Sequence, residues 1–171
     1  MIKNFIYLLI LVTLASCGTF SRDPGQPVND KTAEEILDQA EKSATPGGRK
    51  VLEVSRSMIA SQEIIIGGCW DYINGVYNRA GFPDSARVTT YKSKFQGPYF
   101  KSEDITTGDW LYFVNHSFSE SEHSAIFVTW TNFDTREALM VSYVGGKKKK
   151  PATYKLFKLN KVYNVFRPKE N

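Results

Sequence analysis

Residues 67–72 read Gly-Gly-Cys-Trp-Asp-Tyr, and they open the stretch around which the rest of the chain is organised. From Cys69 to Ala80, apolar residues recur at spacings of three and four, and Gly81 and Pro83 follow. This spacing predicts a helix with one buried face that ends at a glycine. The two glycines permit a sharp turn into the helix, so we expect Cys69 in its first turn. Unpaired backbone N–H groups and the helix dipole favour a thiolate there, as a nucleophile requires.

A second interpretation of Cys69 stands beside the catalytic one. A cysteine on an apolar helix face is often a small buried hydrophobe with no chemical role. Catalysis also requires a base within reach of the sulfur, and this base has to come from elsewhere in the chain.

Composition limits the class of protein. The chain has 171 residues, of which 42% are apolar and 23% charged, so it can build a sizeable core in a single domain. The net charge of +4 is mildly basic, and residues 147–150 are all lysine. Basic and aromatic residues do not interleave as they do in nucleic-acid-binding modules, so we expect no nucleic-acid partner. The lysine run is either a solvated loop or a site of attraction to anionic wall polymer or lipid headgroups.

The N-terminus has the features of an export signal. Residues 1–16 contain a lysine near the start and an apolar run of about ten residues, which is too short to span a bilayer. Residues 14–18, Leu-Ala-Ser-Cys-Gly, resemble the lipobox of bacterial lipoproteins. The resemblance implies cleavage before Cys17 and a diacylglycerol on its sulfur, which anchors the protein to a membrane. The alternative is ordinary secretory cleavage that leaves Cys17 as a free thiol.

Lipidation also bears on redox state and location. The chain contains only one other cysteine, so a lipidated Cys17 leaves Cys69 without a disulfide partner. By analogy with bacterial lipoproteins, Gly18 after the lipidated residue is compatible with sorting to the outer membrane. We therefore expect a periplasm-facing protein of the bacterial cell envelope, at the outer rather than the inner membrane.

The remaining chain is predicted to be one α+β domain. Residues 17–31 are rich in Ser, Pro, Gly, Asn and Asp and predict a flexible tether, which leaves residues 32–171 as the folded part. Two helices are expected before the central one, from Thr32 and from about residue 50, with a Pro-Gly-Gly break between them. A long polar segment after Pro83 has no period and predicts an irregular loop. About five antiparallel strands then follow, at residues 110–114, 123–129, 138–144, 153–159 and 162–167.

His123 is the candidate base. It opens the apolar strand His-Ser-Ala-Ile-Phe-Val, where it can face a site while its neighbours anchor the strand. An imidazole near the start of the central helix would take the proton from Cys69 and pass it to a leaving group. Taken alone, a surface histidine at the end of a strand is the more common situation.

Four motifs in order resemble the NlpC-type papain-like cell-wall peptidases. They are Gly68-Cys69-Trp70-Asp71-Tyr72, Asn78-Arg79-Ala80-Gly81-Phe82-Pro83, Gly108-Asp109-Trp110-Leu111-Tyr112-Phe113 and His123-Ser124-Ala125-Ile126-Phe127-Val128. The resemblance implies a papain-like fold and a catalytic Cys69–His123 pair. It also implies a substrate site shaped by Trp70, Asp71 and Tyr72 beside the sulfur.

The chain departs from the family pattern in three places. Gly68 stands where the family usually has Asp, Trp70 stands where it has a small residue, and residues 64–66, all isoleucine, replace a common tyrosine. The family also has a polar residue on the next strand that orients the imidazole. Counting along the hairpin favours Ser142 for this role, with Asn132 and Asp134 as alternatives on the turn.

The resemblance implies acyl transfer without a cofactor. Cys69 attacks a carbonyl, His123 moves the proton, water cleaves the thioester, and the Cys69 backbone N–H stabilises the oxyanion. We expect a monomeric, lipid-anchored hydrolase of amide bonds in peptidoglycan. Two alternatives remain open: an acyl-lipid or ester hydrolase or acyltransferase with the same pair, and a catalytically inactive envelope binding module. No zinc site is expected, because the two histidines, His116 and His123, lack metal-ligand spacing.

Overall fold

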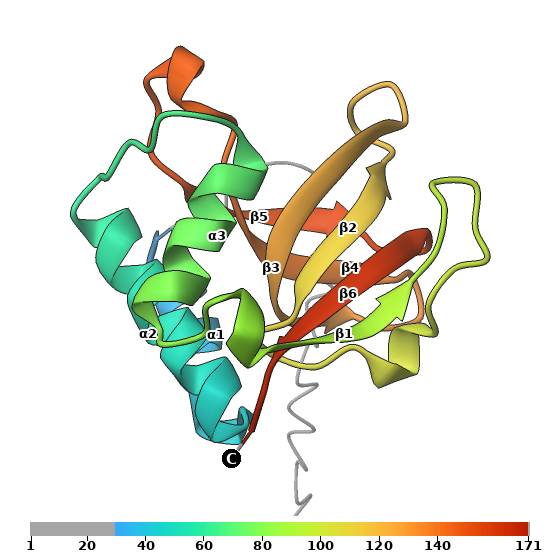
Figure 1. Cartoon of the computed structure of the whole chain (residues 1–171), viewed down its shortest axis with the longest axis horizontal. Coiled ribbons are helices and arrows are strands. Elements are labelled where there is room, and N and C mark those ends of the chain that lie inside the picture. Colours follow the sequence, from blue (N-terminus) through green and yellow to red (C-terminus); the bar gives the residue numbers. More distant parts are fainter. Residues whose placement is uncertain (1–29, 171) are drawn as a thin grey trace, which may run out of the picture.

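The computed structural model describes residues 30–170 as a mixed α+β domain with three helices and a six-stranded antiparallel sheet (Figure 1). The predictions for the signal peptide, for Cys17 and for most of the tether fall on residues outside this described part. The helices are α1 (Asp30–Ser43), α2 (Pro46–Ala60) and α3 (Cys69–Arg79). The strands are β1 (Arg87–Lys92), β2 (Trp110–Asn115), β3 (Ser121–Asn132), β4 (Glu137–Ser142), β5 (Thr153–Lys158) and β6 (Val162–Pro168). Short 3₁₀ turns lie at η1 (Asp84–Ala86), η2 (Ser102–Asp104) and η3 (Gly146–Lys148).

The sheet has the strand order β1-β6-β2-β3-β4-β5, so the last strand of the chain inserts between the first two. The expected count of about five strands is one too low, because β1 lies in the segment that was expected to be an irregular loop. β1 is an edge strand that pairs only with β6, and its side chains are exposed or half-buried. A strand that buries neither face fully carries no alternating apolar pattern, so the sequence gives no sign of it.

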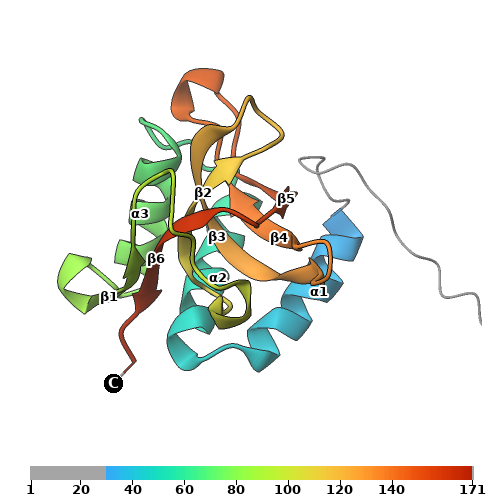
Figure 2. The ribbon, with the colours of Figure 1, turned by 90° about the vertical axis from the view of Figure 1, so that its right-hand side faces the viewer.

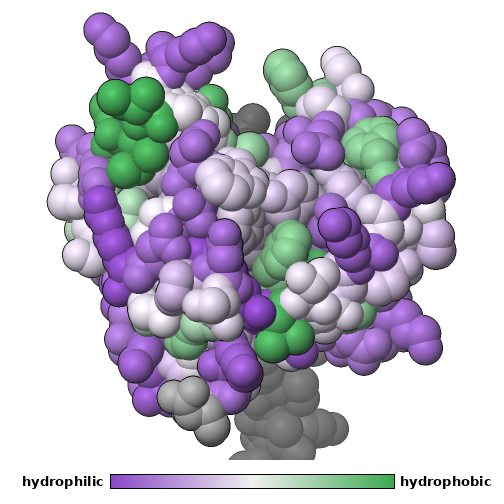
Figure 3. All heavy atoms as spheres, viewed as in Figure 1, coloured by the Kyte–Doolittle hydropathy of each residue, from purple (hydrophilic) through white to green (hydrophobic). Residues whose placement is uncertain are grey.

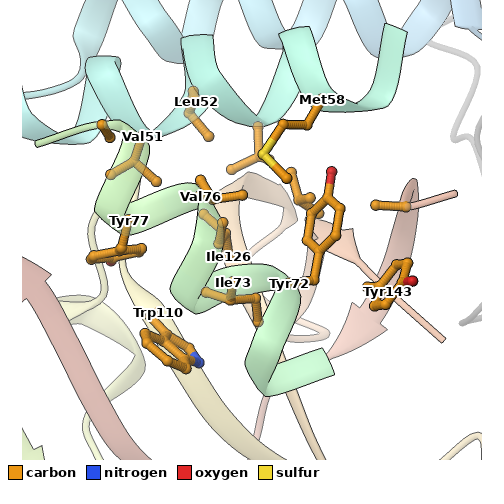
Figure 4. Packing of buried hydrophobic residues seen from close by; sticks show 14 of the residues in the cluster. Val51, Leu52, Met58, Tyr72, Ile73, Val76, Tyr77, Trp110, Ile126 and Tyr143 are labelled. Carbon is orange, nitrogen blue, oxygen red and sulfur yellow. The ribbon is translucent and has the colours of Figure 1, made fainter. Parts of the chain in front are cut away.

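Two hydrophobic clusters lie on opposite faces of the sheet, because side chains alternate along each strand. The helix-side core joins the apolar faces of the three helices to the strands (Figure 4). Its members include Val51, Leu52, Met58, Ile73, Val76, Trp110, Ile126 and Val141. The far-side core contains no residue from α1, α2 or α3. Its members include Leu111, Phe113, Ala125, Phe127, Met140, Phe157 and Val165.

The Pro-Gly-Gly sequence at residues 46–48 begins a helix instead of interrupting two. Thr45 caps α2, because its side-chain oxygen accepts a hydrogen bond from the Gly48 N–H at 3.1 Å, and Pro46 occupies the first turn, where no N–H is needed. A Cβ on Gly48 would lie 2.3 Å from the Thr107 carbonyl oxygen, so glycine allows α2 to approach the turn before β2. The prediction that this tripeptide lies between the helices was therefore wrong.

The Gly-Asp pair before β2 is part of the framework of the fold. Asp109 is completely buried and receives two hydrogen bonds from the Arg167 guanidinium, at 2.7 and 2.8 Å. Burial raises the pKa of Asp109, and the hydrogen bonds from Arg167 oppose this rise. The Tyr77 hydroxyl donates to the Gly108 carbonyl at 2.6 Å and thereby fixes the last turn of α3 against the same turn. These contacts hold the helix that begins with Cys69 against the central strands.

Among residues 30–170, no helix is both long enough and apolar enough to cross a membrane. The chain ends at the bottom of Figures 1 and 2, and η3 projects from the opposite end of the domain in both views.

Candidate active site

Cys69 is the first residue of α3, as the sequence predicts, and it is a free, half-buried cysteine. The N-cap residue Gly68 has no side chain to cap the first turn. The Asp71 carboxylate instead accepts a hydrogen bond from the Gly68 N–H at 2.7 Å. Gly67 has φ of +124°, and a Cβ there would lie 2.1 Å from the Asp71 carboxylate oxygen. The turn into α3 thus requires glycine at position 67 and places a carboxylate beside the cysteine.

The segment before α3 is fastened to the segment after β4. The Tyr143 hydroxyl donates to the Ile65 carbonyl at 2.6 Å and accepts from the Ile65 N–H at 3.0 Å. The Gly146 N–H donates to the Gly67 carbonyl at 2.9 Å. The turn that precedes Cys69 is therefore held in place by residues that follow β4, and its position does not depend on α3 alone.

Two tyrosines of the sheet lie near the sulfur on the helix side. Burial and the charge of a Cys69 thiolate raise the pKa of Tyr112 to about 12. Burial raises the pKa of Tyr163 as well, and its hydroxyl donates to the Glu122 carboxylate at 2.5 Å. Both phenols are therefore neutral at ordinary pH and act as hydrogen-bonding groups. Neither tyrosine was predicted as a site residue, although Tyr112 belongs to one of the four motifs, because a tyrosine in a strand is typical of a core.

His123 is hydrogen-bonded to Ser142, with 3.0 Å between the imidazole Nε2 and the serine Oγ. This is the contact that counting along the hairpin predicts, whereas a catalytic role for Ser142 stays a prediction. The imidazole packs against the rings of Phe113 and Phe157, at 5.6 and 5.5 Å between centroids. Burial, with a smaller contribution from the charge of Lys155, lowers the pKa of His123 to about 4. The ring is therefore neutral at pH 7.

The structure does not bring His123 to Cys69. In the β2–β3 register His123 lies opposite Phe113, and Phe113 belongs to the far-side core. Cys69 begins the helix that packs on the other face of the sheet. The residues of β3 that alternate with His123, and so lie on the helix side, are Glu122 and Ser124. Ser124 is 2% exposed, and its hydroxyl has no hydrogen-bond partner among the described residues.

The three residues predicted to shape a substrate site differ in what they can do. Trp70 is 47% exposed and lies 5.9 Å from Trp110 between ring centroids, so its indole is available beside Cys69. Asp71 is engaged with the Gly68 N–H, as described above. Tyr72 is completely buried and stacks on Tyr143 at 4.6 Å, so it is a core residue that cannot contact a substrate in this conformation (Figure 4).

The remaining polar candidates have structural partners. The Asn132 side chain accepts from the Thr135 N–H at 3.1 Å within the β3–β4 turn, far along the strand from His123. His116 contacts Glu120 and Asn160 at 3.2 and 2.6 Å. Within residues 30–170, no group of three or more His, Cys, Asp or Glu side chains is placed to hold a metal ion.

No protein-family profile, curated protein or solved structure matches this chain.

Proposed function

We propose that this domain is a papain-like module of the bacterial cell envelope that binds a peptidoglycan-derived ligand without cleaving it. One observation carries the proposal: the imidazole of His123 is buried on the face of the sheet opposite to α3 and is held there by Ser142. A cysteine without a base in reach does not perform acyl transfer. The order of elements, a cysteine-bearing helix followed by an antiparallel meander, supports the papain-like arrangement.

The first turn of α3 supplies the ligand-binding chemistry. Trp70 presents a half-exposed aromatic face, on which a sugar ring or an apolar side chain can stack. The helix N-terminus beside it has no capping side chain on Gly68, so its N–H groups can receive a carboxylate. Peptidoglycan peptides carry carboxylates and are joined to sugars, which matches this pair of features.

Sacculus binding tests the proposal. The full chain is incubated with purified sacculi, and both the retained protein and the released muropeptides are measured. We expect retention without release, a several-fold loss of retention for Trp70→Ala, and little change for Cys69→Ala. Muropeptide release that disappears in Cys69→Ala would show that the domain is an enzyme.

A cysteine hydrolase of peptide amide bonds is the second candidate. It is favoured by the position of Cys69 as a free, half-buried thiol in the first turn of a helix. This candidate requires a base on the helix side, so it also requires His123 to leave its contact with Ser142.

Thiol labelling separates the two candidates at low cost. The binding module predicts that Cys69 of the folded chain is alkylated at neutral pH no faster than Cys69 of the urea-unfolded chain. A hydrolase with an activated thiolate predicts alkylation of the folded chain that is many times faster than that of the unfolded chain. The same samples assayed with an aryl ester distinguish an esterase or acyltransferase, for which ester turnover depends on Cys69 while sacculi stay intact.

We also propose that Cys17 is lipidated and that it anchors the protein to the envelope, preferably at the outer membrane. Residues 14–18 support this proposal by their lipobox pattern. Cells fed a labelled fatty acid should incorporate it into the wild-type chain and not into Cys17→Ser. Incorporation that survives this substitution would place the lipid elsewhere.

A further inference from the structure

An exposed apolar patch lies beside a run of lysines at one end of the domain. Ile66 is 96% exposed, and Ile64 and Val144 are each 44% exposed. Lys147–Lys150 follow on η3 and the residues after it, and all four are exposed. Figure 3 shows strongly hydrophobic side chains directly next to hydrophilic ones at the end of the molecule from which η3 projects in Figure 1. We call the set Ile64, Ile66, Val144 and Lys147–Lys150 the end patch.

The end patch is built on a fixed frame. Its two segments are joined by the pair of hydrogen bonds between Tyr143 and Ile65, residues that are 78 positions apart in the chain, and by the hydrogen bond from the Gly146 N–H to the Gly67 carbonyl. A Cβ on Gly146 would lie 2.3 Å from the Ile65 carbonyl oxygen, so glycine at this position permits the close approach. Isoleucines exposed on a frame of this kind gain nothing from the fold and are available to a partner.

The charge of the end patch is uncompensated within the described chain. None of Lys147–Lys150 forms an ion pair with any of residues 30–170. The acidic residues nearest in sequence to Ile64 and Ile66 are Glu63 and Asp71, and both side chains already have partners. Glu63 pairs with Arg79 at 2.5 Å, and Asp71 accepts a hydrogen bond from the Gly68 N–H. The patch therefore presents net positive charge around an apolar centre.

We infer that the end patch docks on an anionic lipid bilayer. Isoleucine side chains enter the boundary between headgroups and acyl chains, while lysines attract the phosphates of anionic lipids. A soluble anionic wall polymer would account for the lysines but would leave Ile66 exposed to water. The combination of both chemistries on one surface favours the bilayer. This inference is independent of the ligand proposed at α3 and of the lipid at Cys17.

Quenching of Trp70 by brominated lipids tests the inference in the full chain. Trp70 follows Ile66 by four residues, in the first turn of α3, and is 47% exposed, whereas Trp110 is 3% exposed. The third tryptophan, Trp130, is half-buried on β3, so it is present alike in the wild type and in the Trp70 variant. Vesicles of brominated phosphatidylcholine with phosphatidylglycerol should quench the wild type and spare Trp70→Phe. An anchor in residues 1–29 alone brings the chain to the vesicle without bringing Trp70 to the acyl chains, so the readout reports docking of the patch.

Substitutions within the end patch give the expected size of the effect. Replacing Lys147–Lys150 by Gln should raise the anionic lipid needed for half-maximal quenching by about a hundredfold, because each lysine near the surface contributes several-fold. Ile66→Asp should raise it by at least about tenfold, and Ile66→Ser serves if the aspartate disturbs folding. The matched control removes the same charge from exposed lysines outside the patch and should leave quenching unchanged; it replaces Lys92, Lys94, Lys101 and Lys158 by Gln.

Three outcomes would overturn the inference. The first is the absence of Trp70 quenching on anionic vesicles by a wild-type chain with an intact thermal transition. The second is an equal loss in the control variant, which would mean that net charge and not the patch matters. The third is binding to a soluble anionic wall polymer that depends on the lysines, with no quenching by lipid. None of these results depends on sacculus binding or on hydrolysis.

Discussion

At the scale of single residues, Asp109 is the most consequential charge of the domain. Its carboxylate is completely buried and is held by Arg167, whose side chain is 29% exposed. We expect Asp109→Asn to lower the free energy of unfolding by about 3 kcal/mol, because it breaks a buried pair and leaves a guanidinium without its partner. Urea denaturation measures the change. The control is Asp84→Asn, whose 90% exposed carboxylate pairs with Arg87 and should contribute less than about 1 kcal/mol.

His123 gives the domain a defined dependence on pH. Its pKa is lowered to about 4 by burial, while an unfolded histidine titrates near 6.5. The unfolded chain therefore binds the proton more readily, and stability is fully present above pH 6.5 and falls as the pH decreases towards 4. We expect the free energy of unfolding to drop by roughly 2 kcal/mol between pH 7 and 4.5 through this residue.

The measurement is urea denaturation at both pH values for the wild type, for His123→Gln and for His116→Gln. The drop should shrink in the first variant and persist in the second, since His116 lies on the β2–β3 connection outside both cores. An NMR titration that gives His123 a pKa above 6 would contradict the buried, neutral imidazole, and it would favour a ring exposed to a site.

At the scale of secondary-structure elements, the turn into α3 depends on one of its two glycines. Gly67 has φ of +124° and no room for a Cβ beside Asp71, whereas a Cβ on Gly68 would meet only the Asp71 carboxylate, at 3.9 Å. Gly67→Ala should lower the free energy of unfolding by about 1–3 kcal/mol. Gly68→Ala should cost less than about 1 kcal/mol. Equal melting temperatures for the two variants would show that the turn relaxes.

Periodicity predicts much of this element structure. The α3 helix begins at Cys69 as expected, and the five predicted strands fall within about three residues of their observed bounds. The mixed α+β class is confirmed. β1 was not predicted, because its side chains are buried on neither face. The start of α2 was predicted wrongly, because a proline and two glycines usually indicate a break, and the sequence does not reveal the contact of Gly48 with Thr107 that requires glycine there.

The site is harder to predict than the elements that carry it. Hairpin counting correctly places Ser142 near His123, because cross-strand neighbours share a face. Hairpin counting does not predict which face of the sheet carries His123 and Ser142. Both faces are covered by apolar residues, so β3 has no alternating pattern that would distinguish them. The distance between sulfur and imidazole depends on that single choice, so the motif order alone could not decide it.

At the scale of the whole molecule, the strand order predicts how stability is distributed. β2 and β3 are central and pair on both sides, while β1 pairs with β6 alone and buries little. Amide hydrogen exchange should therefore be slowest in β2 and β3 and fastest, among the strands, in β1. Protection of β1 equal to that of β3 would mean that another surface covers this edge.

The hydrogen bonds that join Ile65 and Gly67 to Tyr143 and Gly146 have a thermodynamic consequence. They fasten the turn before α3 to the turn after β4, so a bilayer that receives the isoleucines and lysines also meets the first turn of α3. Docking that brings the Trp70 indole to the acyl chains leaves no open face on which a ligand can stack. Ligand at Trp70 and lipid at the lysines should accordingly weaken each other's binding, and by reciprocity the factor is the same whichever arrives first.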